Sequence, residues 1–330
     1  MMWGANLMID ILIKRIKFGV SILLTIILLL PTTTAYAIVG SDRAVSPTEA
    51  RYVGLVEQWY PGEGWLGVCS ASLISPQIML TAAHCVLDVS DAQSLRVKLT
   101  PSSENFKLEI INVTGFIYHT KYEEQQSYDL VDPDTDELIE RIVGRVNPGE
   151  SEYDADIALL YLYEPVTNVK FPKLARTTTK LNPNWRVYGW GATSDDGVIN
   201  SLNTTFVFDA TEEMGRLLED QMDNMLGAYF VEETGLVRST CYGDSGGPLV
   251  DGNGAIIGIT SFALVESCLD PTPTVYLKVA NYRSWIYRAS ARLKGSMNRI
   301  VVPVLPPEIT TYWPGHRFWQ NNRLVILNIR

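Results

Sequence analysis

Short apolar segments separated by turn residues run along the chain from Val53 to about Ala280. Valine, isoleucine, tyrosine and phenylalanine are frequent in these segments, and glycine, proline, asparagine and aspartate bound them, which is typical of β-strands. The clearest examples are residues 70–83, 108–119, 156–163, 185–191 and 254–264. Because strands do not alternate with helical segments, the pattern disfavours a parallel sheet and predicts an all-β fold.

Two segments have the apolar spacing of helices instead. Residues 279–293 carry apolar side chains at positions 279, 282, 285, 286 and 289, which would share one face of a helix. Residues 211–227 carry Met214, Leu217, Leu218, Met222 and Met225 at a similar spacing. The sequence therefore predicts a helix towards the C-terminus and a second helix within 211–227.

The first 37 residues have the pattern of an export signal. A basic run at residues 14–17 is followed by an uncharged apolar run of 13 residues, 18–30. This run is shorter than the roughly 20 residues that a membrane-spanning helix needs. Small residues at positions 35 and 37 fit a signal-peptidase cut before Ile38. We therefore expect residues 1–37 to be a signal peptide, and the mature chain to be secreted or periplasmic with no permanent membrane anchor.

Composition narrows the classes of function. Hydrophobic residues make up 46% of the 330 residues, so the mature chain can bury one large β domain or two medium ones. A net charge of −10 argues against a nucleic-acid partner. An even number of cysteines in an exported protein predicts two disulfides, with three pairings open. The four cysteines are Cys69, Cys85, Cys241 and Cys268.

Two segments differ from the rest in composition. Residues 123–155 hold eleven acidic residues and two arginines, which is nearly the whole net charge. Three interpretations of this acidic insertion stay open: a solvated loop, a loop that shapes specificity, or a metal site. An EF-hand does not fit, since the glutamate that it needs would fall on Val143. Residues 298–330 form a tail rich in proline and aromatic residues, and residues 323–330 within it have the composition of a strand.

The stretch Cys-Tyr-Gly-Asp-Ser-Gly-Gly-Pro-Leu-Val, residues 241–250, is the strongest candidate for chemistry. Three glycines within five residues are costly to order, and they suit a backbone that approaches a ligand closely. Ser245 lies among them. A serine nucleophile needs a base, a group that orients the base, and N–H donors aimed at the developing oxyanion. Three histidines could supply the base: His84, His119 and His316.

Three motifs, in this order, resemble the trypsin/chymotrypsin family of serine endopeptidases. They are Leu-Thr-Ala-Ala-His-Cys (80–85), Asp-Ile-Ala-Leu-Leu (156–160) and Gly-Asp-Ser-Gly-Gly-Pro-Leu (243–249), and residues 189–193 and 279–286 also resemble the family. The resemblance extends from Ile38 to about Ile286. It implies two antiparallel six-stranded Greek-key barrels with the active site between them, a C-terminal helix, and here an extra C-terminal tail. The family's other common disulfides have no cysteines in this sequence, and in this respect the chain resembles bacterial members.

The resemblance also implies a role for each residue of the motifs. Ser245 would be the nucleophile, His84 the general base, and Asp156 the group that orients the imidazole. Asp154 is two residues away, but the family's aspartate directly precedes the Ile-Ala-Leu-Leu pattern, which selects Asp156. The N–H groups of Gly243 and Ser245 would form the oxyanion hole. The implied disulfides are Cys69–Cys85 beside the histidine and Cys241–Cys268 behind the serine.

An activation step follows from the same resemblance. In the family, a free Ile-Val-Gly terminus folds inward and its ammonium pairs with the aspartate before the nucleophile, so Ile38 would pair with Asp244. A cut after Ala37 would produce this terminus directly. A cut after Ala35 also fits the signal-peptidase pattern, and it would leave a dipeptide for another enzyme to remove.

The primary pocket is expected to resemble that of elastases. Its floor lies six residues before the nucleophile, at Ser239, where trypsin-like members have an aspartate. A neutral floor leaves a buried Lys or Arg side chain without a partner. Ser261, Ala263 and Thr274 would line the pocket, and the last two add bulk where relatives have glycine. We therefore expect small or medium aliphatic residues before the scissile bond.

The resemblance sets the expected boundaries and partners. The protease domain would span residues 38–297, with the tail 298–330 after it. Substrates would be proteins or peptides, and no cofactor or metal is expected. The alternative is an inactive, protease-like binding protein, although such relatives usually lack a triad residue and this chain has all three. The tail either packs on the protease body or contacts an envelope or partner. One departure is that Ser70-Ala71 replace a pair of glycines often found after Cys69.

Overall fold

The computed structural model describes most of the chain after the predicted signal peptide. The described residues are 38, 41, 43–46, 49–100, 108–125, 128–131, 138–142, 154–177, 184–192, 201–218, 222–230, 240–263, 268, 273–297, 317–320 and 323–326. The chain divides into two units, Met1–Ala35 and Tyr36–Arg330. The described residues do not include the first unit, the rest of the predicted signal peptide or the predicted pocket floor, Ser239.

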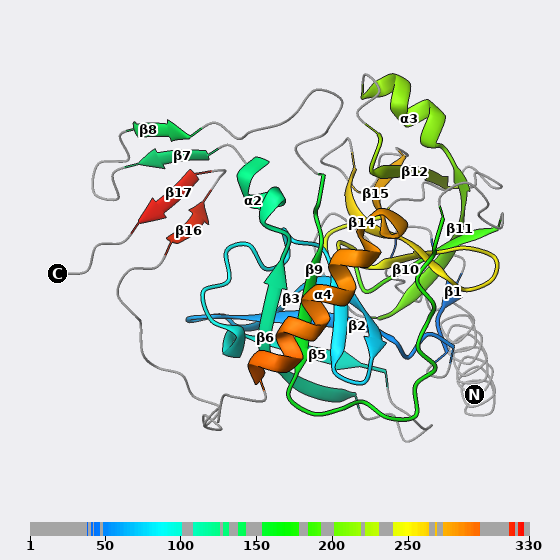
Figure 1. Ribbon diagram of the computed structural model, residues 1–330, viewed down its shortest axis with the longest axis horizontal. Helices are drawn as coiled ribbons and strands as arrows, with labels where there is room; N and C mark the ends of the chain where they lie inside the picture. The colour runs from blue at the N-terminus through cyan, green and yellow to red at the C-terminus, as the bar shows by residue number, and fades with distance from the viewer. Residues whose placement is uncertain are drawn as a thin grey trace, which may run out of the picture. The chain divides into compact units, whose positions relative to one another are not determined.

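The first half of the second unit forms a closed six-stranded barrel (Figure 1). Its strands follow one another around the barrel as β2 (Val53–Tyr60), β3 (Gly64–Ser75), β4 (Ile78–Thr81), β9 (Ala158–Leu162), β6 (Glu109–Tyr118) and β5 (Leu95–Leu99). All neighbours pair antiparallel. In β5, Leu95, Val97 and Leu99 are buried and the two residues between them are partly exposed, as a barrel wall with one apolar face requires.

A second set of strands closes in the same way. The ring contains β11 (Asn203–Asp209), β10 (Trp185–Gly189), β13 (Pro248–Val250), β14 (Ile256–Ala263), β15 (Thr274–Lys278) and β12 (Met225–Phe230), and pairing of β12 with β11 completes it. The short strand β1 (Arg43–Ala44) adds to the outside of β11. The two antiparallel six-stranded barrels of the sequence-based expectation are therefore confirmed.

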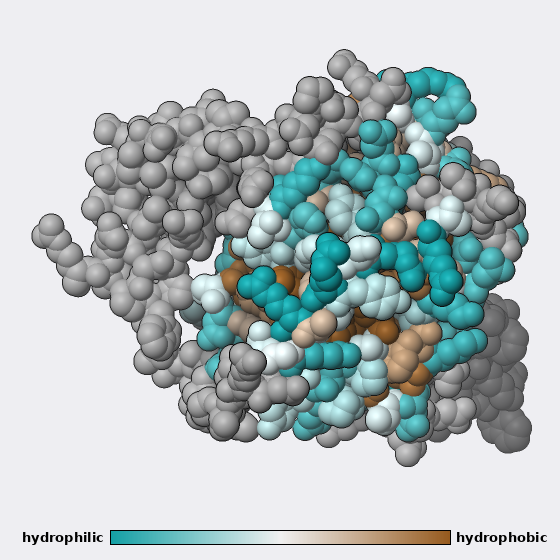
Figure 2. Space-filling view, viewed as in Figure 1, coloured by the Kyte–Doolittle hydropathy of each residue, from teal (hydrophilic) through white to brown (hydrophobic). Residues whose placement is uncertain are grey.

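The predicted C-terminal helix is also confirmed, as α4 (Val279–Met297). Val279, Tyr282, Ile286, Ala289 and Leu293 are buried, at the three- and four-residue steps of one helix face. The helix contacts β6, β9 and β14. Its outer face, which includes Asn281, Ser284, Arg288 and Arg292, is exposed. Hydrophilic residues accordingly dominate along the helix in Figure 2, with apolar patches beside it.

The second predicted helix is wrong over most of its length. The helix α3 (Thr211–Leu217) ends early, and residues from Met225 onwards belong to β12. Met214, Met222 and Met225 are all buried in one small cluster, so the methionines that suggested a single helix face come instead from a helix, a turn and a strand. Antiparallel pairing of β12 with β15 and β11 fixes the strand.

The acidic insertion and the tail share a sheet. The helix α2 (Thr120–Gln125) leads into the insertion, which contains β7 (Tyr128–Val131) and β8 (Leu138–Ile142). The tail contains β16 (Arg317–Gln320) and β17 (Arg323–Ile326). The sheet order is β16-β17-β7-β8, and β17 runs parallel to β7 (Figure 1). The predicted terminal strand is confirmed, and it pairs with β16 on one side and with β7 of the insertion on the other. Elsewhere, a short 3-10 helix (Ala92–Ser94) precedes β5.

In the part of the chain that the structure describes, no helix combines the length and the apolar character needed to cross a membrane.

Candidate active site

Two adjacent strands of the first barrel bring His84 and Asp156 together. The end of β4 pairs with the start of β9, with Thr81 opposite Ala158. His84 follows Thr81 by three residues, and Asp156 precedes Ala158 by two. Residues 72 positions apart in the sequence therefore meet at one end of the barrel.

The carboxylate of Asp156 binds both the backbone and the ring of His84. Its Oδ1 accepts the backbone N–H of His84 at 2.9 Å, and its Oδ2 lies 2.8 Å from the ring Nδ1. Asp156 is fully buried, whereas 32% of the His84 side chain is exposed. An aspartate that holds Nδ1–H leaves the lone pair of Nε2 available, which is the tautomer that a general base needs.

The two pKa values respond to this pairing in opposite directions. Burial alone would lower the pKa of His84, but the charge of Asp156 and the hydrogen bond to it outweigh burial and raise that pKa. Burial alone would raise the pKa of Asp156, but the charge of His84 and the hydrogen bonds from His84 and Ser261 outweigh burial and lower it. The pair therefore favours an ionised aspartate beside an imidazole of increased basicity.

The second barrel contributes to the same carboxylate through Ser261. Its hydroxyl, on β14, donates to Asp156 Oδ2 at 2.6 Å. The sequence suggested Ser261 as a pocket residue; in the structure its side chain is buried and bound to Asp156. This contact spans the interface between the barrels, and no local sequence signal could have predicted it.

Ser245 lies in a tight turn just before β13, and this turn is attached to the first barrel. The C=O of Ser245 accepts the N–H of Ser70 at 2.7 Å, and the C=O of Ser70 accepts the hydroxyl of Thr81 at 2.8 Å. Thr81 is three residues before His84, so the turn is fixed close to the histidine segment. Gly243 and Gly246 have φ of 94° and 78°, which other residues rarely adopt.

The neighbour of Ser245, Asp244, is buried in the same turn. Its Oδ1 accepts the N–H of Gly191 and its Oδ2 the N–H of Cys241, each at 2.8 Å. Burial raises the pKa of Asp244 to about 7, although these two hydrogen bonds act to lower it. A Cβ on either Gly189 or Gly191 would overlap the carboxylate, which explains the Gly-Trp-Gly sequence at 189–191. Within the described residues, no cation pairs with Asp244.

Ile38 is buried in the core of the second barrel, among residues that include Trp185 and Tyr276. Its φ is 63°, an unfavourable conformation for a β-branched residue. No ion pair between Ile38 and Asp244 exists in the intact chain, where residue 38 has no free amine.

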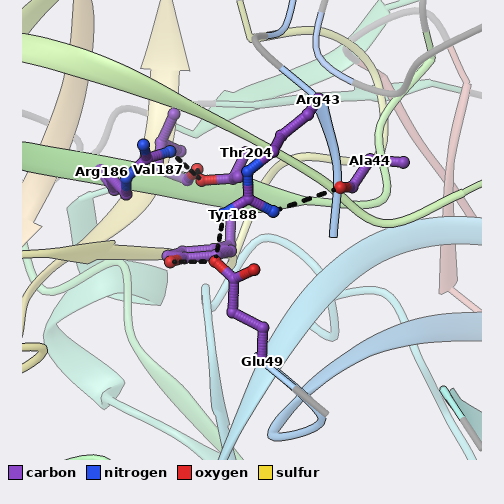
Figure 3. Close-up of polar contacts among 7 residues, drawn as sticks. All are labelled: Arg43, Ala44, Glu49, Arg186, Val187, Tyr188 and Thr204. Atoms are coloured by element: carbon purple, nitrogen blue, oxygen red, sulfur yellow. Dashed lines mark hydrogen bonds and ion pairs between the residues drawn. The ribbon is translucent and has the colours of Figure 1, made fainter. Parts of the chain in front are cut away.

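The segment after Ile38 is anchored on the second barrel (Figure 3). Arg43 forms an ion pair with Glu49 at 2.7 Å, and the hydroxyl of Tyr188 donates to the same carboxylate oxygen at 3.3 Å. The hydrogen bond from Arg43 lowers the pKa of Glu49 by more than burial raises it. In addition, Arg43 of β1 pairs with Thr204 of β11. The chain is thus held at Arg43, five residues after Ile38.

Both disulfides join the expected partners. Cys69–Cys85 and Cys241–Cys268 have S–S distances of 2.05 and 2.09 Å. The first includes the residue next to His84, and the second ties Cys241, at the start of the turn that carries Ser245, to Cys268. Cys69, His84 and Cys85 are the group of potential metal ligands in the described part of the chain, and their two sulfur atoms are already bonded to each other.

Two of the predicted pocket residues are neighbours. Ala263 on β14 pairs directly with Thr274 on β15. The hydroxyl of Thr274 is also 2.8 Å from that of Thr240, which follows Ser239 in the sequence. Sequence reasoning missed Thr240, because its contact joins segments 34 residues apart. It also left no role for Ser70, although the unusual residue at that position was visible.

The chain forms two closed β-barrels, one with a histidine–aspartate pair and the other with a glycine-rich turn that carries a serine. This is the arrangement of the two-barrel serine peptidases. The family model described as Trypsin matches residues 61–286. The chain therefore belongs to the trypsin family and is a serine-type endopeptidase.

Individual relatives agree with this assignment. The chain is 31% identical over 224 residues to hypodermin-B of Hypoderma lineatum, covering 66% of this chain and 76% of that protein. It is 29% identical over 225 residues to a trypsin of Phaedon cochleariae, covering 66% and 77%. Among solved structures, it is similar to neuropsin, a serine protease of mouse brain, with 26% identity, a TM-score of 0.53, and coverage of 74% of this chain and 97% of that one.

Proposed function

We propose that this chain is an exported serine endopeptidase that uses Ser245, His84 and Asp156 as a catalytic triad. The observation that carries the proposal is the double contact of Asp156 with the backbone N–H and the ring Nδ1 of His84. That contact fixes both the position and the tautomer of the imidazole. Three sequence motifs and the family assignment support the same roles.

The reaction would proceed through an acyl-enzyme. Ser245 Oγ attacks the carbonyl carbon of the scissile bond while His84 Nε2 accepts its proton. The N–H groups of Gly243 and Ser245 stabilise the oxyanion of the tetrahedral intermediate. His84 then donates the proton to the leaving amine, and a water molecule activated by His84 hydrolyses the ester. Asp156 stays ionised and stabilises the imidazolium that forms in each half of the reaction.

The primary pocket would accept small or medium aliphatic side chains. Ala263 and Thr274 are adjacent, and the contact of Thr274 with Thr240 supports a pocket that is narrowed by a buried hydroxyl pair. A neutral Ser239 at the floor would leave a substrate Lys or Arg without a counter-charge. The elastase-like preference rests on these residues, and the bacterial type stays a prediction, since the relatives above come from insects and mouse.

Export and activation would be one step. No Lys or Arg directly precedes Ile38, so a trypsin-like activator has no site to cut, whereas signal peptidase could cut after Ala37. The released amine has an ordinary pKa of about 8 and would be mostly charged at neutral pH. Pairing would satisfy the buried carboxylate of Asp244, which has no cation partner among the residues that the structure describes. The mature protein, residues 38–330, would be secreted or periplasmic.

The competing function is an inactive, protease-like binding protein. This alternative needs a defect in the catalytic groups, and His84 and Asp156 make the contacts that a working pair requires. The tail has a separate open role, either in packing on the protease body or in contacting an envelope or partner.

Labelling and mutation of one residue test the proposal. A sulfonyl fluoride directed at serine nucleophiles should modify Ser245 in the mature protein and abolish peptidase activity. Ser245→Ala should reduce kcat by roughly 10⁶, the scale of triad serine removal. Thr260→Ser, which keeps a hydroxyl on the neighbouring strand β14, serves as a control and should retain activity. An active Ser245→Ala variant would overturn the triad, and an inactive wild-type protein that resists the label would favour the binding protein.

A further inference from the structure

Each peptide group of the turn around Ser245 is fixed by its own hydrogen bond. Five consecutive carbonyl groups each accept a hydrogen bond from a fixed donor. In chain order the pairs are Cys241 with Asp244 N–H (3.0 Å), Tyr242 with Ala192 N–H (2.7 Å), Gly243 with Ser70 Oγ (2.8 Å), Asp244 with Gly247 N–H (2.9 Å) and Ser245 with Ser70 N–H (2.7 Å). Four of the donors are backbone N–H groups, and the fifth is the side chain of Ser70.

These bonds decide where the remaining N–H groups point. In a trans peptide, the C=O of one residue and the N–H of the next point in opposite directions. Fixing the C=O of Tyr242 therefore aims the N–H of Gly243, and fixing the C=O of Asp244 aims the N–H of Ser245. Among the described residues, neither N–H donates to a protein acceptor. The peptide between them is the one whose carbonyl Ser70 holds.

The hydroxyl of Ser70 is itself oriented. Its Oγ accepts the N–H of Trp190 at 2.9 Å and donates to the C=O of Gly243 at 2.8 Å. A hydroxyl has one hydrogen, so the bond from Trp190 leaves that hydrogen for the carbonyl. The residue is fully buried, and water cannot replace either partner without a rearrangement. The next N–H groups along the chain, those of Gly191 and Ala192, donate to Asp244 and Tyr242 of the same turn.

We propose that Ser70 is a positioning residue for the oxyanion hole. Its side chain holds the C=O of Gly243 and its backbone holds the C=O of Ser245, so Ser70 fixes the two peptides that flank the Asp244–Ser245 peptide. The N–H of that middle peptide belongs to Ser245, and the peptide fixed by the side chain separates it from the N–H of Gly243, so that both N–H groups converge on the reacting oxygen. The inference rests on the proposed roles of Gly243 and Ser245. A glycine at position 70 would supply only the backbone bond and would leave the carbonyl of Gly243 and the N–H of Trp190 without buried partners.

Removal of the hydroxyl tests the proposal in the mature enzyme. Ser70→Ala should lower kcat by about 10- to 100-fold, less than the loss on removing a direct oxyanion donor, and should leave KM for a small peptide substrate nearly unchanged. Affinity for a peptidyl trifluoromethyl ketone, whose adduct with a serine carries an oxyanion, should fall by the same factor. Affinity for a non-covalent competitive inhibitor that fills only the primary pocket should not change.

Ser72 provides a matched control. It lies two residues further along β3 and is buried, and its hydroxyl has no hydrogen-bond partner in the described part of the chain. Ser72→Ala should therefore keep the wild-type kcat and the wild-type affinity for the ketone. Ser70→Cys keeps a weak donor of similar size and should recover part of what Ser70→Ala loses. If the alanine variant does not fold, a kcat and a ketone affinity of Ser70→Cys that fall together below those of wild type would support the proposal, because a thiol is a weaker donor than a hydroxyl.

The outcomes separate this proposal from the triad. Wild-type kcat and ketone affinity in Ser70→Ala, with an inactive Ser245→Ala variant, would remove the positioning role and leave the triad intact. A raised KM with unchanged kcat would contradict positioning as well, because the defect would then lie in substrate binding. An active Ser245→Ala variant would instead overturn the proposed function itself.

Discussion

Two opposing effects set the protonation of His84. Burial disfavours the imidazolium, and Asp156 favours it through its charge and a 2.8 Å contact. The charge and the hydrogen bond prevail, so the pKa of His84 is raised above its ordinary value of about 6.5. A general base works only when it is unprotonated, so this shift has a kinetic consequence.

We expect kcat/KM to fall on the acid side with an apparent pKa above 6.5, as His84 becomes protonated. Asp156→Asn should move this acid-side fall in kcat/KM to lower pH, since it removes the charge that raises the pKa of His84. It should also lower kcat by about 10⁴, since the asparagine no longer selects the tautomer of the imidazole. The measurement is a pH–rate profile on a small peptide substrate. His119→Phe is the control, because His119 packs against Tyr282 and Trp285. This substitution should leave the acid-side pKa of kcat/KM unchanged.

Thr274 makes the pocket hypothesis testable at a single position. Thr274→Gly should remove the contact with Thr240 and widen the space beside Ala263. Activity on substrates with Phe or Tyr before the scissile bond should then rise relative to Ala or Val, by about tenfold or more, the scale of one or two methylene groups in a pocket. Thr274→Ser keeps the hydroxyl pair and should shift the preference less. A wild-type preference for Arg would contradict the proposed pocket.

The candidate site was predictable where local motifs carry it. The sequence motifs predicted roles for His84, Asp156 and Ser245, because each lies in a short stretch of characteristic composition, and the structure brings the first two into contact. The contacts of Ser261 with Asp156 and of Ser70 with Gly243 were not predictable. Each joins two barrels across more than 100 residues of chain, and serine in a strand looks the same in sequence whether its hydroxyl has a partner or not.

Secondary-structure elements were likewise predictable where the signal is local, and not where it depends on residues distant in sequence. Alternating or continuous apolar segments predicted the strands, and α4 was predicted from its single buried face. The interpretation of 211–227 as one helix was wrong because buried methionines cluster in space without lying on one helix. The strand at 323–330 was predicted, but its parallel pairing with β7 was not, since a pairing so distant in sequence has no local signal.

A pair of glycine substitutions tests how closely one element is fitted to its neighbour. Gly189 ends β10, and a Cβ there would overlap the carboxylate of Asp244. Gly189→Ala should therefore destabilise the protein by about 2 kcal/mol or more and abolish most activity, because Asp244 must move from the N–H of Gly191. The measurements are denaturant unfolding and kcat.

Gly295 in α4 is the matched control. Its Cβ would have open space on all sides. Gly295→Ala should leave activity unchanged and stabilise the protein by up to about 1 kcal/mol, because alanine favours the helix. Equal effects of the two substitutions would contradict the close fit around Asp244.

At the scale of the whole molecule, the buried Asp244 links processing to stability. In the intact chain its pKa is raised to about 7 by burial, against two backbone hydrogen bonds that lower it. Ile38 is meanwhile held at a φ of 63°. A residue at a free N-terminus has no preceding carbonyl, so a cut before Ile38 removes this conformational restriction and creates an amine that could pair with the carboxylate.

The two forms should therefore differ in the pH dependence of their stability. A carboxyl whose pKa is raised on folding holds its proton more tightly in the folded state, so the free energy of unfolding of the uncut form should fall as the pH rises from about 4 to about 7. The loss is on the order of 4 kcal/mol, since a tenfold difference in proton affinity between the folded and unfolded states corresponds to about 1.4 kcal/mol. In the cut form, the ammonium of Ile38 should remove most of this loss. The pairing raises the pKa of that amine above about 8, so its stabilisation is present at neutral pH and is lost as the pH rises through the raised value.

A fusion that replaces residues 1–37 with a removable tag, cut directly before Ile38, allows the comparison. Urea unfolding of the cut and uncut forms between pH 4 and 9, together with peptidase activity, measures both effects. Asp244→Asn is the control, because the asparagine does not titrate: the uncut variant should lose its fall in stability between pH 4 and 7, and the cut variant should stay largely inactive. If the cut and uncut wild-type forms follow the same stability curve and are equally active, then the amine of Ile38 does not bind Asp244 and export is not the activation step.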